Sequence, residues 1–389
     1  AFYTNISLSL VFCLLIIVSA DFVSNAYGLP EASLYLKLLT LSLFIKSFGI
    51  VQESILKKEL NFKSFAIRTS ISKTLSSIIA IVLVFTGFGI YSLIWQSISF
   101  SLFSVLSIWY LGDWKPSLQF RFTTFKRVIF FSINFFKAKL ISVIYTKSDD
   151  FLIGYFFGAQ TLGLYTVALN LVTRVLQTIN GVIIGYVYPL MSSRSKKDIK
   201  NVYIKIFRHL SFISLLTFMF ILLYSNQIIN VLLGDEWLDS GFYVKVLTIW
   251  AVAKVISGLT SETLKALNKV KAVFRVKVIE TLLKLAMFLI LPLFLDIKWV
   301  MLGVYVVLGI YMVIYYVVEL NKSISMNVML YVKTYFYRFI YLIPLFLASL
   351  ISLENNYIAL VLGGMASLLA AGIYYLKNKD LKMFIVKSV

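Results

Sequence analysis

The sequence has 389 residues, of which 60% are hydrophobic and only 14% are charged, and its mean hydropathy is +0.90. A water-facing surface for a chain of this size needs more charged residues, so the composition excludes an ordinary soluble protein. The net charge of +20 is divided among many short connections, whereas a nucleic-acid-binding protein gathers its basic residues on one water-facing domain.

Apolar stretches of about twenty residues recur along the chain, each long enough to cross roughly 30 Å of hydrocarbon as an α-helix. The sequence therefore predicts an all-α integral membrane protein with about twelve transmembrane helices. In chain order, the predicted spans are 3–22, 32–52, 65–86, 90–111, 126–146, 160–191, 206–233, 242–267, 272–294, 298–321, 334–352 and 356–376. No connection between them is long enough to form a soluble domain.

The distribution of Lys and Arg tests this reading, because these residues favour cytoplasmic loops. In and around alternate connections, from the one after the second span to the C-terminal tail, lie 27 of the 37 Lys and Arg residues, whereas the other connections hold only Lys147 and Lys298. The split predicts that both chain ends are cytoplasmic, in a bacterial cytoplasmic (inner) membrane. The chain starts at Ala1 without an initiator Met, and we expect that N-terminal sequence is missing.

A weak internal repeat suggests how the spans are grouped. Leu56-Lys57, at the end of the second span, recurs 208 residues later as Leu264-Lys265, at the end of the eighth. Repeats of six spans are a known way to build a transporter from two lobes. The repeat predicts two pseudo-symmetric six-helix lobes around a central cavity, and a chance match between common residues is the alternative. The predicted parts are an N-terminal lobe at 1–112, a C-terminal lobe at 126–321, and two additional helices with a cytoplasmic tail at 334–389.

Cys13 is the only cysteine and His209 the only histidine. Single copies of these residues cannot form a disulfide, a Cys/His metal site or a Cys/His nucleophile, so we expect no metal. Every outer connection is also too short for the loop that carries catalytic groups in membrane glycosyltransferases, so we expect no catalytic residue and predict that the protein is not an enzyme.

Apart from these 27 and 2 residues, eight basic residues lie inside predicted spans, where a Lys or Arg costs roughly 2.5 to 3.5 kcal/mol and usually faces a bundle interior or a water-filled cavity. Lys37 and Lys245 lie near outer helix ends and can reach water, and Lys284 follows Glu280 by one helical turn, so that pair can neutralise itself. The five without such a local explanation are Lys46, Lys137, Lys139, Arg174 and Lys254.

Arg174 lies deep in the sixth span, between Asn170 four residues before it and Gln177 three residues after it. On a helix, these three side chains form one polar stripe. Lys137 and Lys139 differ by about 200° around one helix, so only one of them can face the same cavity. Several buried cations with few anions predict a cavity that attracts a negatively charged ligand, and structural pairing of the charges is the alternative.

Asp149 and Asp150 sit at the outer end of the fifth span. Two adjacent carboxylates repel each other when both are charged and can bind a proton or Na⁺, which makes them candidates for ion coupling. Solvation at the membrane surface is the alternative. Beyond a proton or Na⁺ gradient, we expect no cofactor.

Several short motifs lie between Ser148 and Ser192, namely Asp149-Asp150-Phe151-Leu152-Ile153-Gly154, Phe157-Gly158-Ala159, Leu162-Gly163-Leu164-Tyr165 and Tyr188-Pro189-Leu190-Met191-Ser192. This stretch resembles the polysaccharide transporter family, whose members are flippases for lipid-linked oligosaccharides and are related to lipid II flippases and multidrug exporters. The resemblance extends over essentially the whole chain, through the motifs Leu56-Lys57-Lys58-Glu59-Leu60-Asn61-Phe62-Lys63, Trp114-Lys115-Pro116 and Leu232-Leu233-Gly234-Asp235-Glu236-Trp237.

The resemblance implies an intact protein of about fourteen helices, of which this chain lacks the first two, with a cavity between two lobes. It also implies that Lys137 or Lys139, Arg174 and the Asp149-Asp150 pair lie in or near the transport path. Where family members often have Arg, this chain has Asn170, with Arg174 one turn later on the same face.

The leading hypothesis is an alternating-access flippase for undecaprenyl-pyrophosphate-linked oligosaccharide repeat units of a surface polysaccharide such as O-antigen or exopolysaccharide. Its expected partners are the lipid-linked sugar, the bilayer, a polysaccharide polymerase and glycosyltransferases, and no nucleic acid. One alternative is a cation-coupled multidrug exporter of the same superfamily, which would need acidic cavity residues. The other is a membrane glycosyltransferase or polymerase, which would need a larger outer loop.

Overall fold

The computed structural model describes residues 2–58, 62–111, 114–116, 122–192, 195–326, 328–351 and 355–377. Over these residues the regular secondary structure is helical and includes no strand, which confirms the predicted all-α class. The chain divides into two compact units, residues 1–144 and 145–389, and each unit is described by itself.

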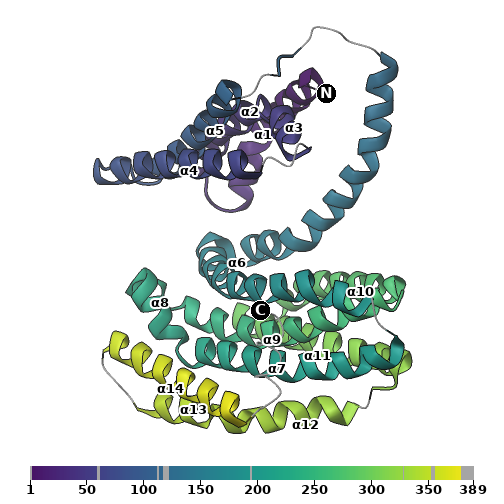
Figure 1. Cartoon of the computed structure of the whole chain (residues 1–389). Helices are drawn as coiled ribbons and strands as arrows, with labels where there is room; N and C mark the ends of the chain where they lie inside the picture. Colours follow the sequence, from purple (N-terminus) through teal and green to yellow (C-terminus); the bar gives the residue numbers. More distant parts are fainter. Residues whose placement is uncertain are drawn as a thin grey trace. The chain divides into compact units, whose positions relative to one another are not determined.

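The first unit contains five helices and the first part of a sixth (Figure 1). The five are α1 (Phe2–Ala26), α2 (Ala32–Ser47), α3 (Ile50–Lys58), α4 (Phe62–Phe85) and α5 (Tyr91–Leu111). Helix α2 packs against both α1 and α5, and α5 packs against α4. Small polar side chains allow close contact at these interfaces, as where the Cys13 thiol donates to the Thr40 carbonyl at 3.4 Å.

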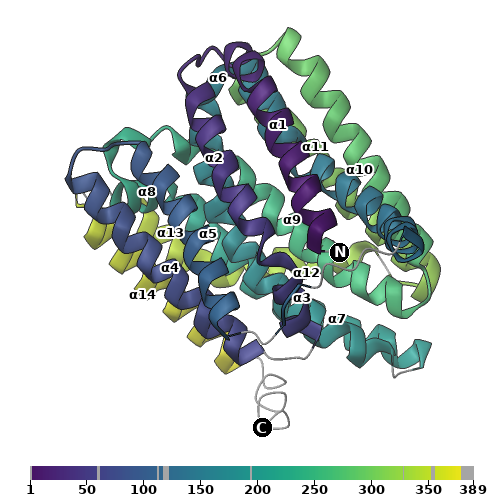
Figure 2. The same cartoon turned by 90° about the horizontal axis from the view of Figure 1, so that it is seen from above.

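The second unit contains the remaining helices, which Figure 2 shows from above. They are the rest of α6 (Phe122–Ser192), α7 (Lys196–Leu223), α8 (Ser225–Leu233), α9 (Ser240–Ala266), α10 (Val270–Ile290), α11 (Ile297–Ile324), α12 (Val328–Phe339), α13 (Ile343–Leu350) and α14 (Asn356–Lys377). Short 3-10 turns cover Asp235–Trp237, Leu291–Leu293 and Ile340–Leu342.

Helix α6 is 71 residues long and covers both the fifth and the sixth predicted spans. The sequence predicts a connection between the spans at residues 147–159, but the structure continues the helix through most of it. The break lies at Gly158, whose φ of 81° belongs to the left-handed region that favours glycine. The helix is therefore kinked at one glycine and needs no loop there.

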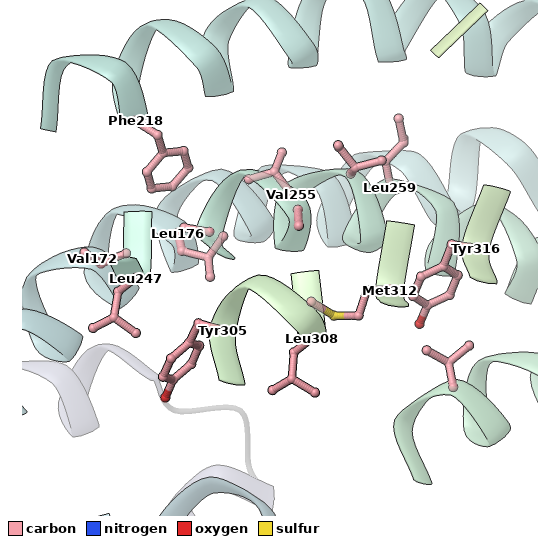
Figure 3. Close-up of a cluster of buried hydrophobic side chains, with 14 of the residues drawn as sticks. Val172, Leu176, Phe218, Leu247, Val255, Leu259, Tyr305, Leu308, Met312 and Tyr316 are labelled. Atoms are coloured by element: carbon pink, nitrogen blue, oxygen red, sulfur yellow. The ribbon is translucent and has the colours of Figure 1, made fainter. Parts of the chain in front are cut away.

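Helix α9 forms the centre of the second unit, packing against both α7 and α11. Figure 3 shows its side chains Val255 and Leu259 among Leu308 and Met312 of α11, and all four are buried. Helices α12 and α14 pack on α7, and α14 also packs on α13. The most deeply enclosed helix is apolar on several sides, as expected for a bundle in a membrane.

Among the described residues, eight helices are long and apolar enough to cross a membrane, or nine if the bent pair α2 and α3 forms one span. Helix α10 is not among them, and it carries five charged side chains. The chain is thus a multi-pass membrane protein. The total of about twelve spans and the two pseudo-symmetric lobes stay predictions.

Close packing of α14 on Tyr224 yields a prediction. A Cβ added at Gly363 would lie 2.6 Å from two ring atoms of Tyr224, a side chain that is only 3% exposed. We expect Gly363→Ala to lower the unfolding free energy by about 1–3 kcal/mol relative to Gly364→Ala, because the buried ring cannot move aside. At Gly364, nothing lies within 4 Å of the added Cβ, so the two variants share the same gain in helix propensity. Equal thermal stability of both variants in detergent would contradict this packing.

Candidate functional site

Asp149, on α6, is buried in the second unit, and both of its carboxylate oxygens contact polar side chains. Its Oδ1 lies 3.4 Å from Nζ of Lys284 on α10, and the two side chains are only 7% and 9% exposed. Its Oδ2 accepts hydrogen bonds from the hydroxyls of Tyr165 at 2.8 Å and Tyr305 at 3.1 Å. This carboxylate is therefore held inside the protein instead of being solvated at the surface.

The two tyrosine hydroxyl oxygens lie 2.5 Å apart as well as next to Asp149. Each hydroxyl has one proton, so Tyr165 and Tyr305 together can make only two of the three hydrogen bonds at any moment. The third contact is then a pair of oxygens with no proton between them. A proton can rearrange among these three groups without any movement of the backbone.

Helix α10 places its buried charges by a spacing of four residues. Its buried face runs through Val276, Glu280, Lys284 and Phe288, whereas Lys277 is exposed. Residues four apart lie on the same side of a helix. The sequence pattern thus turns one acidic and one basic side chain toward the centre of the unit.

A second ion pair links α9 to the same face of α10. Nζ of Lys254 lies 2.5 Å from Oε1 of Glu280, and it also lies 5.2 Å from the ring centre of Trp250. Trp250 in turn packs edge-on against the ring of Tyr305 at 5.4 Å. The two ion pairs are therefore connected both through α10 and through Trp250.

We call this set the buried charge network: Asp149, Lys284, Glu280 and Lys254, with the hydroxyls of Tyr165 and Tyr305. Its four charged side chains come from α6, α9 and α10, and Tyr305 comes from α11. Two carboxylates balance two ammonium groups, so the free-energy cost of burying the set is lower than that of burying the same charges without partners. The expectation that Glu280 and Lys284 neutralise each other is incomplete, because each has a salt-bridge partner on another helix.

The predicted polar stripe lies on the exposed side of α6. Asn170, Arg174 and Gln177 are exposed, whereas Val172 and Leu176, labelled in Figure 3, point into the hydrophobic core. The stripe therefore faces away from the core of the second unit. None of its three side chains contributes to the buried charge network.

The other predicted site residues are dispersed. Lys46 is exposed in the last turn of α2, and Lys139 is exposed on α6. The side chain of Lys137 lies outside the described residues. Asp150 pairs at 2.6 Å with Lys147, a side chain that is 66% exposed. Among the predicted residues with described side chains, only Asp149 and Lys254 belong to one network.

Sequence reasoning missed the roles of Tyr165, Tyr305 and Glu280. A signal was present for Glu280, because Lys254 and Glu280 lie at similar distances from the short connection between α9 and α10 and so reach the same depth in an antiparallel hairpin. No local signal pairs Asp149 with Lys284, which are 135 residues apart. In the part of the chain that the structure describes, no group of three or more His, Cys, Asp or Glu side chains could hold a metal ion.

Comparison with known proteins places the chain among polysaccharide biosynthesis proteins. The model of the family described as "Polysaccharide biosynthesis protein" matches residues 1–242. The succinoglycan biosynthesis transport protein ExoT of Rhizobium meliloti (strain 1021) is 24% identical over 201 residues, which are 51% of this chain and 41% of that protein. The teichuronic acid biosynthesis protein TuaB of Bacillus subtilis (strain 168) is 22% identical over 269 residues, 68% of this chain and 56% of that protein. The matched segments thus span about half the length of these two relatives.

The amylovoran biosynthesis protein AmsL of Erwinia amylovora is 21% identical over 270 residues, 68% of this chain and 70% of that protein. Among solved structures, the lipid II flippase MurJ in its inward closed conformation matches with a TM-score of 0.72. That match covers 98% of this chain and 83% of the flippase chain at 18% sequence identity, so it shows a shared fold.

The network predicts an asymmetry between single and paired substitutions. Lys284→Met should lower the unfolding free energy by about 3–5 kcal/mol, because it leaves the Asp149 carboxylate buried without its cation. Asp149→Asn combined with Lys284→Met should restore most of that loss, because no unpaired charge remains. Chemical unfolding of the purified protein in detergent measures both.

Lys147→Met is the matched control, since Lys147 also pairs with an aspartate on α6 but is exposed. Its effect should be no more than about 1 kcal/mol. If the double variant is as unstable as Lys284→Met alone, the two charges do not depend on each other.

Proposed function

The chain belongs to the polysaccharide biosynthesis protein family, and from this premise we propose that it is a flippase for undecaprenyl-pyrophosphate-linked oligosaccharide repeat units. In this proposal it moves them from the inner to the outer leaflet of a bacterial cytoplasmic membrane by alternating access. In this proposal the chain only transports the repeat units, whereas glycosyltransferases make them and a polysaccharide polymerase uses them. The fold shared with a lipid II flippase supports this class of activity.

The observation that carries the proposal is the exposed stripe of Asn170, Arg174 and Gln177 on α6. It lies inside Thr146–Ser192, a stretch apolar enough to span a membrane. An arginine that faced lipid at this depth would be costly, so an exposed one indicates a water-filled path or an anionic ligand. Guanidinium groups bind phosphate oxygens in pairs, which suits a pyrophosphate. The flanking amides suit the hydroxyls of a sugar.

The buried charge network narrows the set of substrate-binding candidates. Lys254 is bound to Glu280 and packed against Trp250, so its charge is already neutralised inside the unit. We therefore assign Lys254 to the stability of the bundle. Arg174, Lys139 and Lys46, which are exposed, remain the candidates for contact with the substrate, together with Lys137 from the sequence analysis.

Asp149 remains the candidate for ion coupling, and its surroundings favour a proton over Na⁺. A Na⁺ ion needs free oxygen ligands, but the ammonium of Lys284 already occupies the place next to Oδ1. Oδ2 is in contact with two hydroxyls that can rearrange their protons. We therefore propose that the Asp149 carboxylate takes up a proton during the change between the inward-facing and outward-facing states. The contact between Asp149 and Lys284 loosens at the same time.

Removal of the arginine tests the proposed binding site. Arg174→Ala should reduce the surface polysaccharide made by the native host at least about tenfold, because a charge-assisted bond to phosphate is lost. Arg174→Lys should keep part of the activity. The amount of protein in the membrane, measured by immunoblot, should stay unchanged.

The control is Lys269→Ala, an exposed basic residue in the connection before α10 that should have no effect. Normal polysaccharide from variants at Arg174, Lys139 and Lys46 alike would contradict the assignment. Changed drug susceptibility with normal polysaccharide would point to a multidrug exporter instead.

The nature of the coupling ion can be tested separately. Flipping of a lipid-linked oligosaccharide in proteoliposomes should continue when K⁺ replaces Na⁺ and should slow when a protonophore removes the pH gradient. Asp149→Asn combined with Lys284→Met should make the rate insensitive to the pH gradient, because the group that takes up the proton is gone and no unpaired buried charge is left to destabilise the protein. A rate that depends on Na⁺ and ignores the protonophore would refute proton coupling while leaving the flippase assignment intact.

A further inference from the structure

A cavity of about 580 Å³ lies between α12, the 3-10 turn at Ile340–Leu342, α13 and α14. Helices α13 and α14 lie side by side in Figure 1 and pack on each other. The cavity is separate from the buried charge network and from the polar stripe, since it shares no residue with them. It is open to the outside of the unit, because Ile340 and Ile343 on its wall are 52% and 51% exposed.

The backbone explains why a cavity forms here. Between α12 and α13, the helix changes to a 3-10 turn and resumes with Pro344 in its first turn. Proline has no N–H to donate, so a regular α-helix cannot run through this point without losing a hydrogen bond. The interruption prevents a regular helix from running beside α14 through this segment and leaves space between α14 and the chain from α12 to α13.

One end of the cavity is cationic. It is lined by Arg338 of α12 and Lys377 in the last turn of α14, and no lining residue in the described part of the chain is acidic. Arg338 donates from Nη1 to the Thr334 carbonyl at 3.3 Å, whereas its Nε is buried and has no hydrogen-bond partner among the described residues. Arg338 and Lys377 therefore place two positive charges on a cavity wall that, among the described residues, carries no counter-charge.

Neighbouring helices add to the positive potential. The hydroxyl of Tyr374, on the cavity wall, lies 3.0 Å from Nδ1 of His209 and donates to the Arg208 carbonyl at 3.3 Å. Arg208 and Arg338 both interact electrostatically with Tyr374. Tyr374 is held firmly, because its ring stacks on Phe212 at 3.8 Å. The wall of the cationic end therefore contains a tyrosine ring that packing holds in place.

The rest of the cavity is apolar and adjoins the exposed helix surface. Ile343 and Ile373 line it, and Ile373 is 39% exposed. Tyr337 and Tyr341 stand between the basic and the apolar parts along α12 and the following turn. Tyrosines at such a boundary are typical of the interface between head groups and hydrocarbon.

We propose that this cavity binds an anionic phospholipid of the cytoplasmic leaflet. Its phosphate would lie against Arg338 and Lys377, and its acyl chains would follow Ile343 and Ile373 along the outside of the unit. The distribution of basic connections predicts that this end of α12 and α14 is cytoplasmic, and anionic lipids in that leaflet attract such basic groups. The site does not depend on the proposed transport function.

Lipid binding to the purified full chain tests the site directly. Native mass spectrometry with added phosphatidylglycerol or phosphatidylcholine should show tighter binding of phosphatidylglycerol. Arg338→Gln combined with Lys377→Gln should weaken it roughly 10- to 30-fold, because two contacts with the phosphate are removed. Arg338→Lys should bind nearly as well as the original chain, and unfolding temperatures should verify that each variant is folded.

The matched control is Lys269→Gln combined with Lys271→Gln, two exposed lysines at the start of α10 on the same predicted side. This pair should bind phosphatidylglycerol as the original chain does. Equal binding of the two lipids, or an equal loss in the control pair, would overturn the proposal. So would displacement by soluble glycerol phosphate or by a polyprenyl diphosphate, because the occupant would then be a free phosphate or the transported lipid.

Discussion

The salt bridge between Asp149 and Lys284 is the interaction on which the second unit depends most. Helix α10 carries five charged side chains, and two of them lie on the face that packs into the bundle. An ionised group buried without a partner costs several kcal/mol, so α10 can take this place only if α6 supplies a carboxylate and α9 supplies an ammonium. Asp149 and Lys254 are those groups. The pairs also fix the rotation of α10, because a turn about its axis would separate both at once.

This requirement bears on how such a protein changes state. Breaking either pair leaves two buried charges unbalanced, so a movement that separates Asp149 from Lys284 requires the carboxylate to be neutralised. While both pairs are intact, they join α6, α9 and α10. Asp149 contacts two tyrosine hydroxyls as well as Lys284. Uptake of a proton at Asp149 would therefore weaken its contact with Lys284 while its contacts with the two hydroxyls remain. Coupling at the network would then be a small local change that alters the balance between two rigid arrangements.

The sequence predicts the helices and the polar stripe because both follow from local periodicity. The stripe of Asn170, Arg174 and Gln177 needs only the helical repeat, and the structure places all three on one exposed side of α6. The sequence predicts a connection at residues 147–159, because hydropathy shows where apolar runs end but not whether the helix continues between them. The structure has a kink at Gly158 instead. The partner of Lys284 could not be predicted, because Asp149 is 135 residues away and only tertiary packing brings the two together.

The basic residues of this chain therefore divide by environment. Those turned into the second unit are matched by carboxylates, as Lys254 and Lys284 show, and contribute nothing to the field outside it. The net charge of +20 therefore comes from the other basic residues, many of which are exposed and can act on anions. Arg174 is exposed within the apolar stretch Thr146–Ser192, whereas Arg338 lines a cavity together with Tyr337 and Tyr341. The same type of charge is thus assigned to a transported anion in one proposal and to a resident lipid in the other, because its surroundings differ.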